Sequence, residues 1–153
     1  MFSHHLSSYH LSVTWLKLKH PKYLIPYLIL SGRIIREVRV SEGFLKGKVL
    51  GTAGLSMWTA TLWTSREASN AFHLQGVHWK SVRTIGKWSS EAASGHKNIN
   101  SRQLPQWEHI AALLKQTGNP YTFEPYSSTK PVAELISIPK IPIFAMCFSR
   151  VRA

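Results

Sequence analysis

The spacing of apolar residues switches between a strand period and a helix period along the first half of the chain. Residues 10–19 mix β-branched and aromatic side chains with polar ones and end before Pro21, which predicts a first strand. Residues 24–39 place apolar side chains three or four positions apart, which predicts a helix with one apolar face. Residues 43–51, interrupted by glycines, and residues 56–63, rich in Trp and Thr, predict a hairpin of two further strands.

The second half of the chain carries helix start and stop signals. The sequence Thr-Ser-Arg-Glu at residues 64–67 fits a capping box, so we expect a helix to begin there and to end at Gly76. A further helix is expected over about residues 77–88, and residues 92–100 are polar with weak strand character. The last predicted helix covers residues 105–117, since proline is favoured in the first turn of a helix.

This order of elements is that of a ferredoxin-like α+β domain. We predict a four-stranded antiparallel sheet with helices on one face, formed by one domain over residues 11–118. Residues 1–10 are expected to be a flexible N-terminus, and residues 119–153 a proline-containing tail that packs on the domain or on a dimer partner. The tail is expected to pack because it carries apolar side chains that are costly to leave in water: Ile136, Ile138, Ile141, Ile143 and Phe144.

The charge of the chain narrows the classes of partner. Lys and Arg number 19 against seven acidic residues, so the formal net charge is +12. Such an excess favours an anionic partner, whether nucleic acid, an acidic lipid surface or a small anion. The basic residues are scattered and accompany no recognisable nucleic-acid-reading motif, so we do not predict nucleic-acid binding.

Cysteine and hydropathy bear on location. Cys147 is the one cysteine, which excludes an intramolecular disulfide and a thiolate metal cluster and suits a cytoplasmic protein. Two stretches are apolar, residues 23–30 and 131–148. The first is too short for a spanning helix, which needs about 20 apolar residues, and the second contains charges and prolines. We therefore predict no transmembrane segment.

Several short motifs occur in a familiar order. They are Gly43-Phe44-Leu45, Trp58-Thr59-Ala60-Thr61-Leu62-Trp63, Gly76-Val77-His78, Trp88 with Glu91-Ala92 and His96, and Leu104-Pro105-Gln106-Trp107. Together they resemble the antibiotic-biosynthesis-monooxygenase-like superfamily of dimeric α+β barrels, and in particular its branch related to spheroidene monooxygenase. The resemblance covers about residues 11–118. It implies a homodimer whose pocket, between sheet and helices, accepts a small apolar or haem-like ligand.

Five residues within these motifs are candidate site residues. His78 and His96 are the catalytic candidates, because a neutral imidazole in a cleft can act as acid, base or haem ligand. Either histidine can instead be structural. Trp63, Trp88 and Glu91 are candidates for ligand binding, with Trp63 in the pocket wall and Glu91 either orienting a histidine or capping a turn. Tryptophans in such strands also serve as core or dimer interface.

The alternation of side chains along a strand separates two of the tryptophans. Trp58 and Trp63 have opposite parity, so one faces the helices and the other the opposite face of the sheet. No spacing typical of a metal site is present, and His10 belongs with His4 and His5 to the terminus expected to be flexible. We predict no metal site, and either no cofactor or haem.

Two functions remain open. The leading hypothesis is monooxygenase-like chemistry, as the resemblance implies, with the substrate itself activating oxygen in cofactor-free members of such families. The alternative is a non-catalytic ligand-binding or interaction module with a basic surface for an anionic partner. An oxygenase should contain an enclosed, mostly apolar pocket with at least one buried titratable group, whereas an interaction module should have a shallow or filled one. The homodimer is expected to form through the sheet face that the helices leave uncovered.

Overall fold

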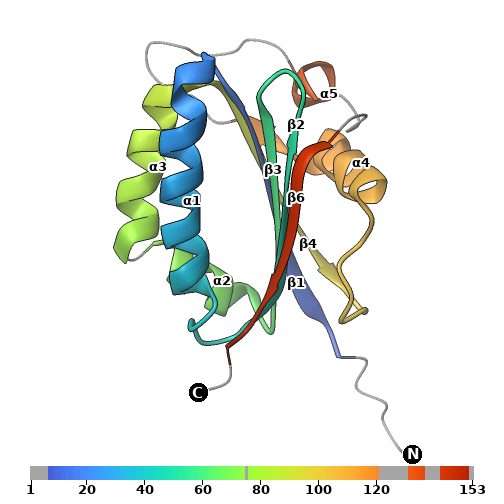
Figure 1. Ribbon diagram of the computed structural model, residues 1–153. Coiled ribbons are helices and arrows are strands. Elements are labelled where there is room, and N and C mark those ends of the chain that lie inside the picture. Colours follow the sequence, from blue (N-terminus) through green and yellow to red (C-terminus); the bar gives the residue numbers. More distant parts are fainter. Residues whose placement is uncertain (1–6, 75, 121–130, 137–141, 152–153) are drawn as a thin grey trace, which may run out of the picture.

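A computed structural model describes residues 7–74, 76–120, 131–136 and 142–151. It shows an antiparallel sheet with helices packed on it (Figure 1). Within these residues the sheet has six strands in the order β5-β4-β1-β3-β2-β6. The strands are β1 (Tyr9–Leu18), β2 (Phe44–Thr52), β3 (Ser56–Trp63), β4 (Ser89–Ile99), β5 (Asn119–Pro120) and β6 (Pro142–Ser149). The predicted hairpin is confirmed as β2 and β3, which pair antiparallel from Phe44 opposite Trp63 to Thr52 opposite Ser56.

The helices form two groups on opposite sides of the sheet (Figure 1). The short 3-10 helix η1 (Pro21–Tyr23) leads into α1 (Leu24–Val38), which lies on one side with α2 (Arg66–His73) and α3 (Gly76–Trp88). The other side carries α4 (Trp107–Thr117) and α5 (Val132–Leu135). A capped helix begins where predicted, but the N-cap is Ser65 rather than Thr64, and its hydroxyl accepts a hydrogen bond from the Ala68 N–H at 3.1 Å. The helix ends at His73, and Gly76, the predicted stop, instead begins α3.

Two parts of the fold prediction are wrong. The sheet has six strands rather than four, because residues of the tail add β6 beside β2 and a two-residue β5 beside β4. Helices also cover both faces rather than one (Figure 1). The physical reason lies in β1 and β3, which carry large apolar side chains on the face away from α1, and α4 and α5 bury that face within the same chain. The dimer prediction assumed that one face of the sheet is open to a partner. Here α4 and α5 cover that face over β1 and β3, so this argument for a dimer no longer holds.

The core on the α4 side is tightly filled. Trp15 and Trp58 are 2% and 1% exposed, and they pack with Ile110 and Leu114 of α4. Trp63 belongs to a different cluster on the α1 side, so the two β3 tryptophans do lie on opposite faces, as their parity predicted.

Two glycines of β2 explain how β6 is seated. A Cβ atom on Gly47 would lie 2.5 Å from the Phe148 ring, and one on Gly51 would lie 2.1 Å from the Phe144 ring. The Phe148 and Phe144 rings therefore occupy the space that a side chain at position 47 or 51 would need. These two ring contacts and the backbone pairing with β2 hold β6 in place.

The apolar residues of the tail have different surroundings. Ile136 is buried against the α4 core and Phe144 is partly buried, whereas Ile143 is 58% exposed. Ile138 and Ile141 lie outside the described residues.

Candidate functional site

A cavity of about 490 Å³ lies between the sheet and the helices α1, α2 and α3. Its origin is visible in the alternation of the strands. On this face β1 presents Ser12 and Thr14, β3 presents Thr59 and Thr61, and β4 presents Ser94. The same strands present large apolar side chains to α4 on their other face. Because small hydroxyl residues leave space that the helices do not fill, the sheet becomes a polar floor beneath apolar helix walls.

The helix walls of the cavity are largely apolar, with one buried phenol. Leu28, Ile34 and Ile35 line it from α1, and Val82 and Ile85 line it from α3. Tyr27 is 6% exposed and its hydroxyl is hydrogen-bonded to the side chains of Ser31 and Thr59. Burial raises the pKa of Tyr27, so the phenol stays protonated at neutral pH and can donate a hydrogen bond within the cavity.

Two histidines meet where α2 gives way to α3. The rings of His73 and His78 are perpendicular, with centroids 4.6 Å apart. His73 Nδ1 donates to the Ser69 carbonyl at 2.7 Å, and His78 Nδ1 donates to the His73 carbonyl at 3.3 Å. With both Nδ1 protons held by backbone oxygens, each neutral ring keeps Nε2 as a free acceptor.

Burial keeps these two rings neutral. It lowers the pKa of His73 from 6.5 to about 4, with the neighbouring His78 adding to the effect. Burial also lowers the pKa of His78, although the His73 carbonyl acts in the opposite direction. Both imidazoles therefore lack a proton on Nε2 at neutral pH, which is the state a base or a hydrogen-bond acceptor requires.

A second pair of histidines joins β1 to β4. His10 Nδ1 donates to Asn98 Oδ1 at 3.0 Å, so its Nε2 accepts the hydrogen bond from His96 Nδ1 at 3.2 Å. The two rings are stacked with centroids 5.2 Å apart. Burial, followed by the nearby His10, lowers the pKa of His96. His96 lines the cavity and is exposed, which puts it at an open part of the cavity.

Two aromatic rings form a wall beside the His73 and His78 pair. Trp63 is fully buried and its indole N–H donates to the Thr61 hydroxyl at 2.9 Å. Phe72 lies 5.5 Å from the Trp63 ring and 5.2 Å from the His78 ring. This wall gives a ligand apolar surface directly beside the imidazoles.

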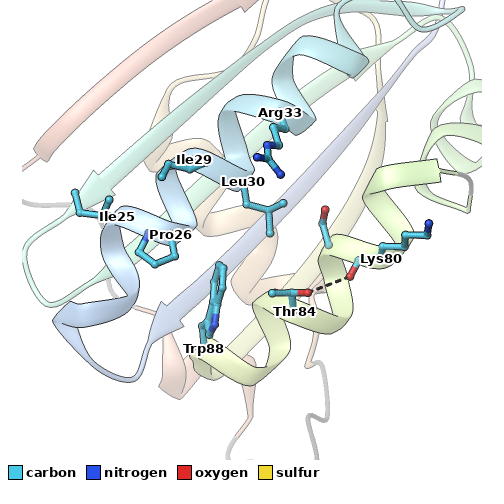
Figure 2. Close-up of a pocket in the computed structure, with 9 residues that line it drawn as sticks. Ile25, Pro26, Ile29, Leu30, Arg33, Lys80, Thr84 and Trp88 are labelled. Carbon is cyan, nitrogen blue, oxygen red and sulfur yellow. Dashed lines mark hydrogen bonds between the residues drawn. The ribbon is translucent and has the colours of Figure 1, made fainter.

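The five candidates from the sequence fall into two groups. Trp63, His78 and His96 line the same cavity. Trp88 lies elsewhere, at the end of α3, where its ring stacks on Tyr23 at 6.0 Å and lines a groove between α1 and α3 (Figure 2). Glu91 stands opposite Lys17 in the β1 and β4 register and is not among the residues that line the cavity.

Other site residues were missed by the sequence analysis. They are His10, His73 and Tyr27, together with the hydroxyl residues of the sheet floor. His10 belongs to β1 and is 3% exposed, rather than lying in a flexible terminus. The signal that was available is the period-two run of Ser and Thr on β1 and β3, which marks a strand face that is polar although it lies under helices.

Metal-ligand clusters and membrane-spanning helices are both absent among the described residues. No group of three or more His, Cys, Asp or Glu side chains in that part of the chain could hold a metal ion. No helix within the same residues is long and apolar enough to cross a membrane.

Solved structures share this fold at low sequence identity. "Putative antibiotic biosynthesis monooxygenase from Nitrosomonas europaea" matches with a TM-score of 0.51 and 11% identity, over 60% of this chain and 86% of that chain. A conserved protein from Methanosarcina mazei Go1 matches with a TM-score of 0.56 and 12% identity, over 60% of this chain and 93% of that chain. A protein of unknown function from Nitrosomonas europaea matches with a TM-score of 0.56 and 9% identity, over 65% and 97%.

Sequence comparisons add nothing to this. No protein-family model and no curated protein matches the chain. At these identities the structural likeness concerns the fold alone. The chain has an α+β fold similar to that of antibiotic-biosynthesis-monooxygenase-like structures.

Proposed function

We propose that the chain is a monooxygenase-like protein that binds a small apolar ligand in the cavity between the sheet and α1 to α3. The observation that carries the proposal is the pair of neutral imidazoles, His73 and His78, beside the Trp63 wall of a mostly apolar cavity. A cavity of about 490 Å³ suits a small ligand. The alternative, an interaction module with a shallow or filled pocket, has less support because this cavity has room for a ligand and is lined by buried titratable groups.

The chemistry proposed for His78 is proton abstraction. Its Nε2 accepts the proton of a phenol or enol, and the resulting anion lies against the apolar rings of Trp63 and Phe72. The anion passes its electrons to O₂. One oxygen atom forms the new C=O bond of the product, and the other leaves as water with the two hydrogens that the substrate loses, so no external reductant is needed.

The His96 pair has a supporting part in this proposal. When Nε2 of His96 takes a proton, its Nδ1–H already donates to His10, and His10 donates to Asn98. This chain of hydrogen bonds stabilises the charged ring and offers a route for the proton out of the cavity. Tyr27 is the donor at the α1 wall that can bind a ligand oxygen.

Haem is the one cofactor that the sequence left open, and the donor set suits it. His78 holds its Nδ1 proton on a backbone carbonyl, so its Nε2 is the atom that would hold the haem iron. Bound haem would activate oxygen, whereas in the cofactor-free chemistry the substrate anion activates it. An absorption spectrum of the purified protein separates the two, because haem has an intense visible band.

The activity is testable with 1-naphthol, which combines an acidic hydroxyl with a compact apolar ring system. Oxidation to 1,4-naphthoquinone consumes one O₂ and releases one water for each naphthol. Oxygen uptake, with ¹⁸O₂ label found in the quinone, is the expected result, and His78→Ala should abolish it. His109→Ala, an exposed histidine on α4, is the control and should leave the rate unchanged. Oxygen uptake that is the same in His78→Ala and in the wild type would refute the role of this residue.

The proposal also covers the family branch, the assembly and the location of the protein. The relation to the spheroidene monooxygenase branch rests on the sequence motifs alone. A homodimer is proposed, and β6 offers apolar surface for it, since Ile143 and Met146 are 58% and 46% exposed on an edge strand. A cytoplasmic location is proposed from the single cysteine.

A further inference from the structure

The outer side of α1 and α3 carries an apolar groove that is separate from the cavity under these helices (Figure 2). Ile25, Ile29 and Leu30 line it from α1, and Trp88 lines it from α3. Its volume is about 490 Å³. The groove is open to the surface and its walls are mostly apolar, so it suits a hydrocarbon chain.

Exposed apolar side chains extend the groove into a patch. Ile25 is 63% exposed and Ile29 is 57% exposed. Single residues of this kind are common on protein surfaces. Two of them one turn apart on α1, beside an apolar groove, mark a surface that buries itself against something apolar.

Basic side chains surround this patch. Arg33 and Lys80 line the groove, and Arg36, Arg83 and Lys87 are exposed on the same two helices. The sequence of α1 contains one acidic residue, Glu37, and that of α3 contains none. We name the surface made by Ile25, Ile29, Trp88, Arg33 and Lys80, with the three further basic residues, the basic groove surface.

We propose that the basic groove surface docks on an anionic phospholipid bilayer. Arg and Lys side chains meet the phosphate and carboxylate groups of the lipids, the two isoleucines enter the interface, and the groove takes part of an acyl chain. Trp88 in the groove wall suits the headgroup level, where tryptophan is enriched. Nucleic acid is the weaker occupant, because a phosphate backbone gives no partner to two exposed isoleucines and an apolar groove.

The test is co-sedimentation with lipid vesicles. The protein should bind vesicles of phosphatidylcholine with roughly one-third phosphatidylserine, and bind pure phosphatidylcholine vesicles far more weakly. Added salt should weaken binding to the anionic vesicles, since the charges lie at the surface. Each basic side chain removed should weaken binding roughly fivefold.

Matched variants locate the surface. Arg33→Gln with Lys80→Gln should weaken vesicle binding roughly 25-fold, whereas Lys97→Gln with Arg102→Gln, which removes the same charge from exposed sites outside α1 and α3, should change it far less. Ile29→Ser should weaken binding roughly tenfold. Val151→Ser is its control, an apolar residue outside α1, α3 and β6 that is 43% exposed.

Three outcomes would overturn the proposal. One is equal binding to both kinds of vesicle, which would remove the charge argument. Another is an equal loss of binding in the control pair and the Arg33 and Lys80 pair, which would make the effect one of net charge alone. The last is tight binding to duplex DNA without binding to either vesicle. Circular dichroism of each variant checks that the fold is retained.

Discussion

The pH dependence of stability should reveal the buried state of His73. We expect the free energy of unfolding to be constant with respect to this residue above pH 6.5, and to fall as the pH drops from 6.5 toward about 4. The reason is that the unfolded chain takes up a proton on His73 near pH 6.5, whereas the folded protein takes it up only near pH 4. Between these values the unfolded state binds more protons and is favoured by acid.

The size of the effect follows from the shift in pKa. A change from 6.5 to about 4, at about 1.4 kcal/mol for each pKa unit, gives about 3 kcal/mol of stability lost at the acid end. Urea unfolding of the wild type and of His73→Gln, at several pH values from 7 to about 4, measures it. The variant loses ring contacts with Trp63 and Phe72 and should be less stable at pH 7. Its stability should nevertheless depend less on pH than that of the wild type.

The control is His109→Gln, which removes an exposed histidine on α4 and should keep the wild-type pH dependence. Taking the difference between wild type and variant removes the contribution of carboxylates, which is common to both. Identical pH dependence in the wild type and in His73→Gln would show that His73 is not held neutral by burial, and the reasoning about the neutral imidazole pair would fail with it.

Three further predictions concern packing and assembly. Thr61→Val should destabilise the protein by about 1–3 kcal/mol in urea unfolding, because the buried Trp63 N–H loses its acceptor, and Thr61→Ser should restore most of the loss. Gly51→Ala should destabilise by about 1–3 kcal/mol through its clash with Phe144, while Gly32→Ala, with open space on α1, should stabilise by about 0.5–1 kcal/mol. Light scattering should give twice the 17.4 kDa chain mass at micromolar concentration, and a monomer mass would contradict the homodimer.

Local signals in the sequence were sufficient for several elements. The hairpin of β2 and β3 and the helix start at Ser65 depend on neighbouring residues, and both are confirmed. Residues 92–100 were expected to have weak strand character because they are polar, and the buried positions there are small, with Ala92, Ala93 and Gly95. β4 is nevertheless an 11-residue strand, since it lies between β1 and β5 and takes its stability from pairing.

Non-local contacts were beyond the sequence. β6 begins at Pro142 in a tail punctuated by prolines, and proline is tolerated there because the strand is at the edge of the sheet and begins with it. His73 gave no signal of its own, because its meeting with His78 depends on how α3 follows α2. The His10 and His96 pair depends in the same way on the register between β1 and β4, which places residues far apart in sequence side by side.

The most direct test of the proposed site is the position of a bound ligand. Crystals soaked with 6-bromo-2-naphthol allow the bromine to be located by its anomalous scattering. The proposal predicts a bromine peak inside the cavity between the sheet and α1 to α3, with the naphthol hydroxyl within hydrogen-bond distance of His78 Nε2 and the ring against Trp63. A bromine peak found only outside this cavity would contradict the proposal. The contradiction would be strongest if the cavity were then filled by its own side chains.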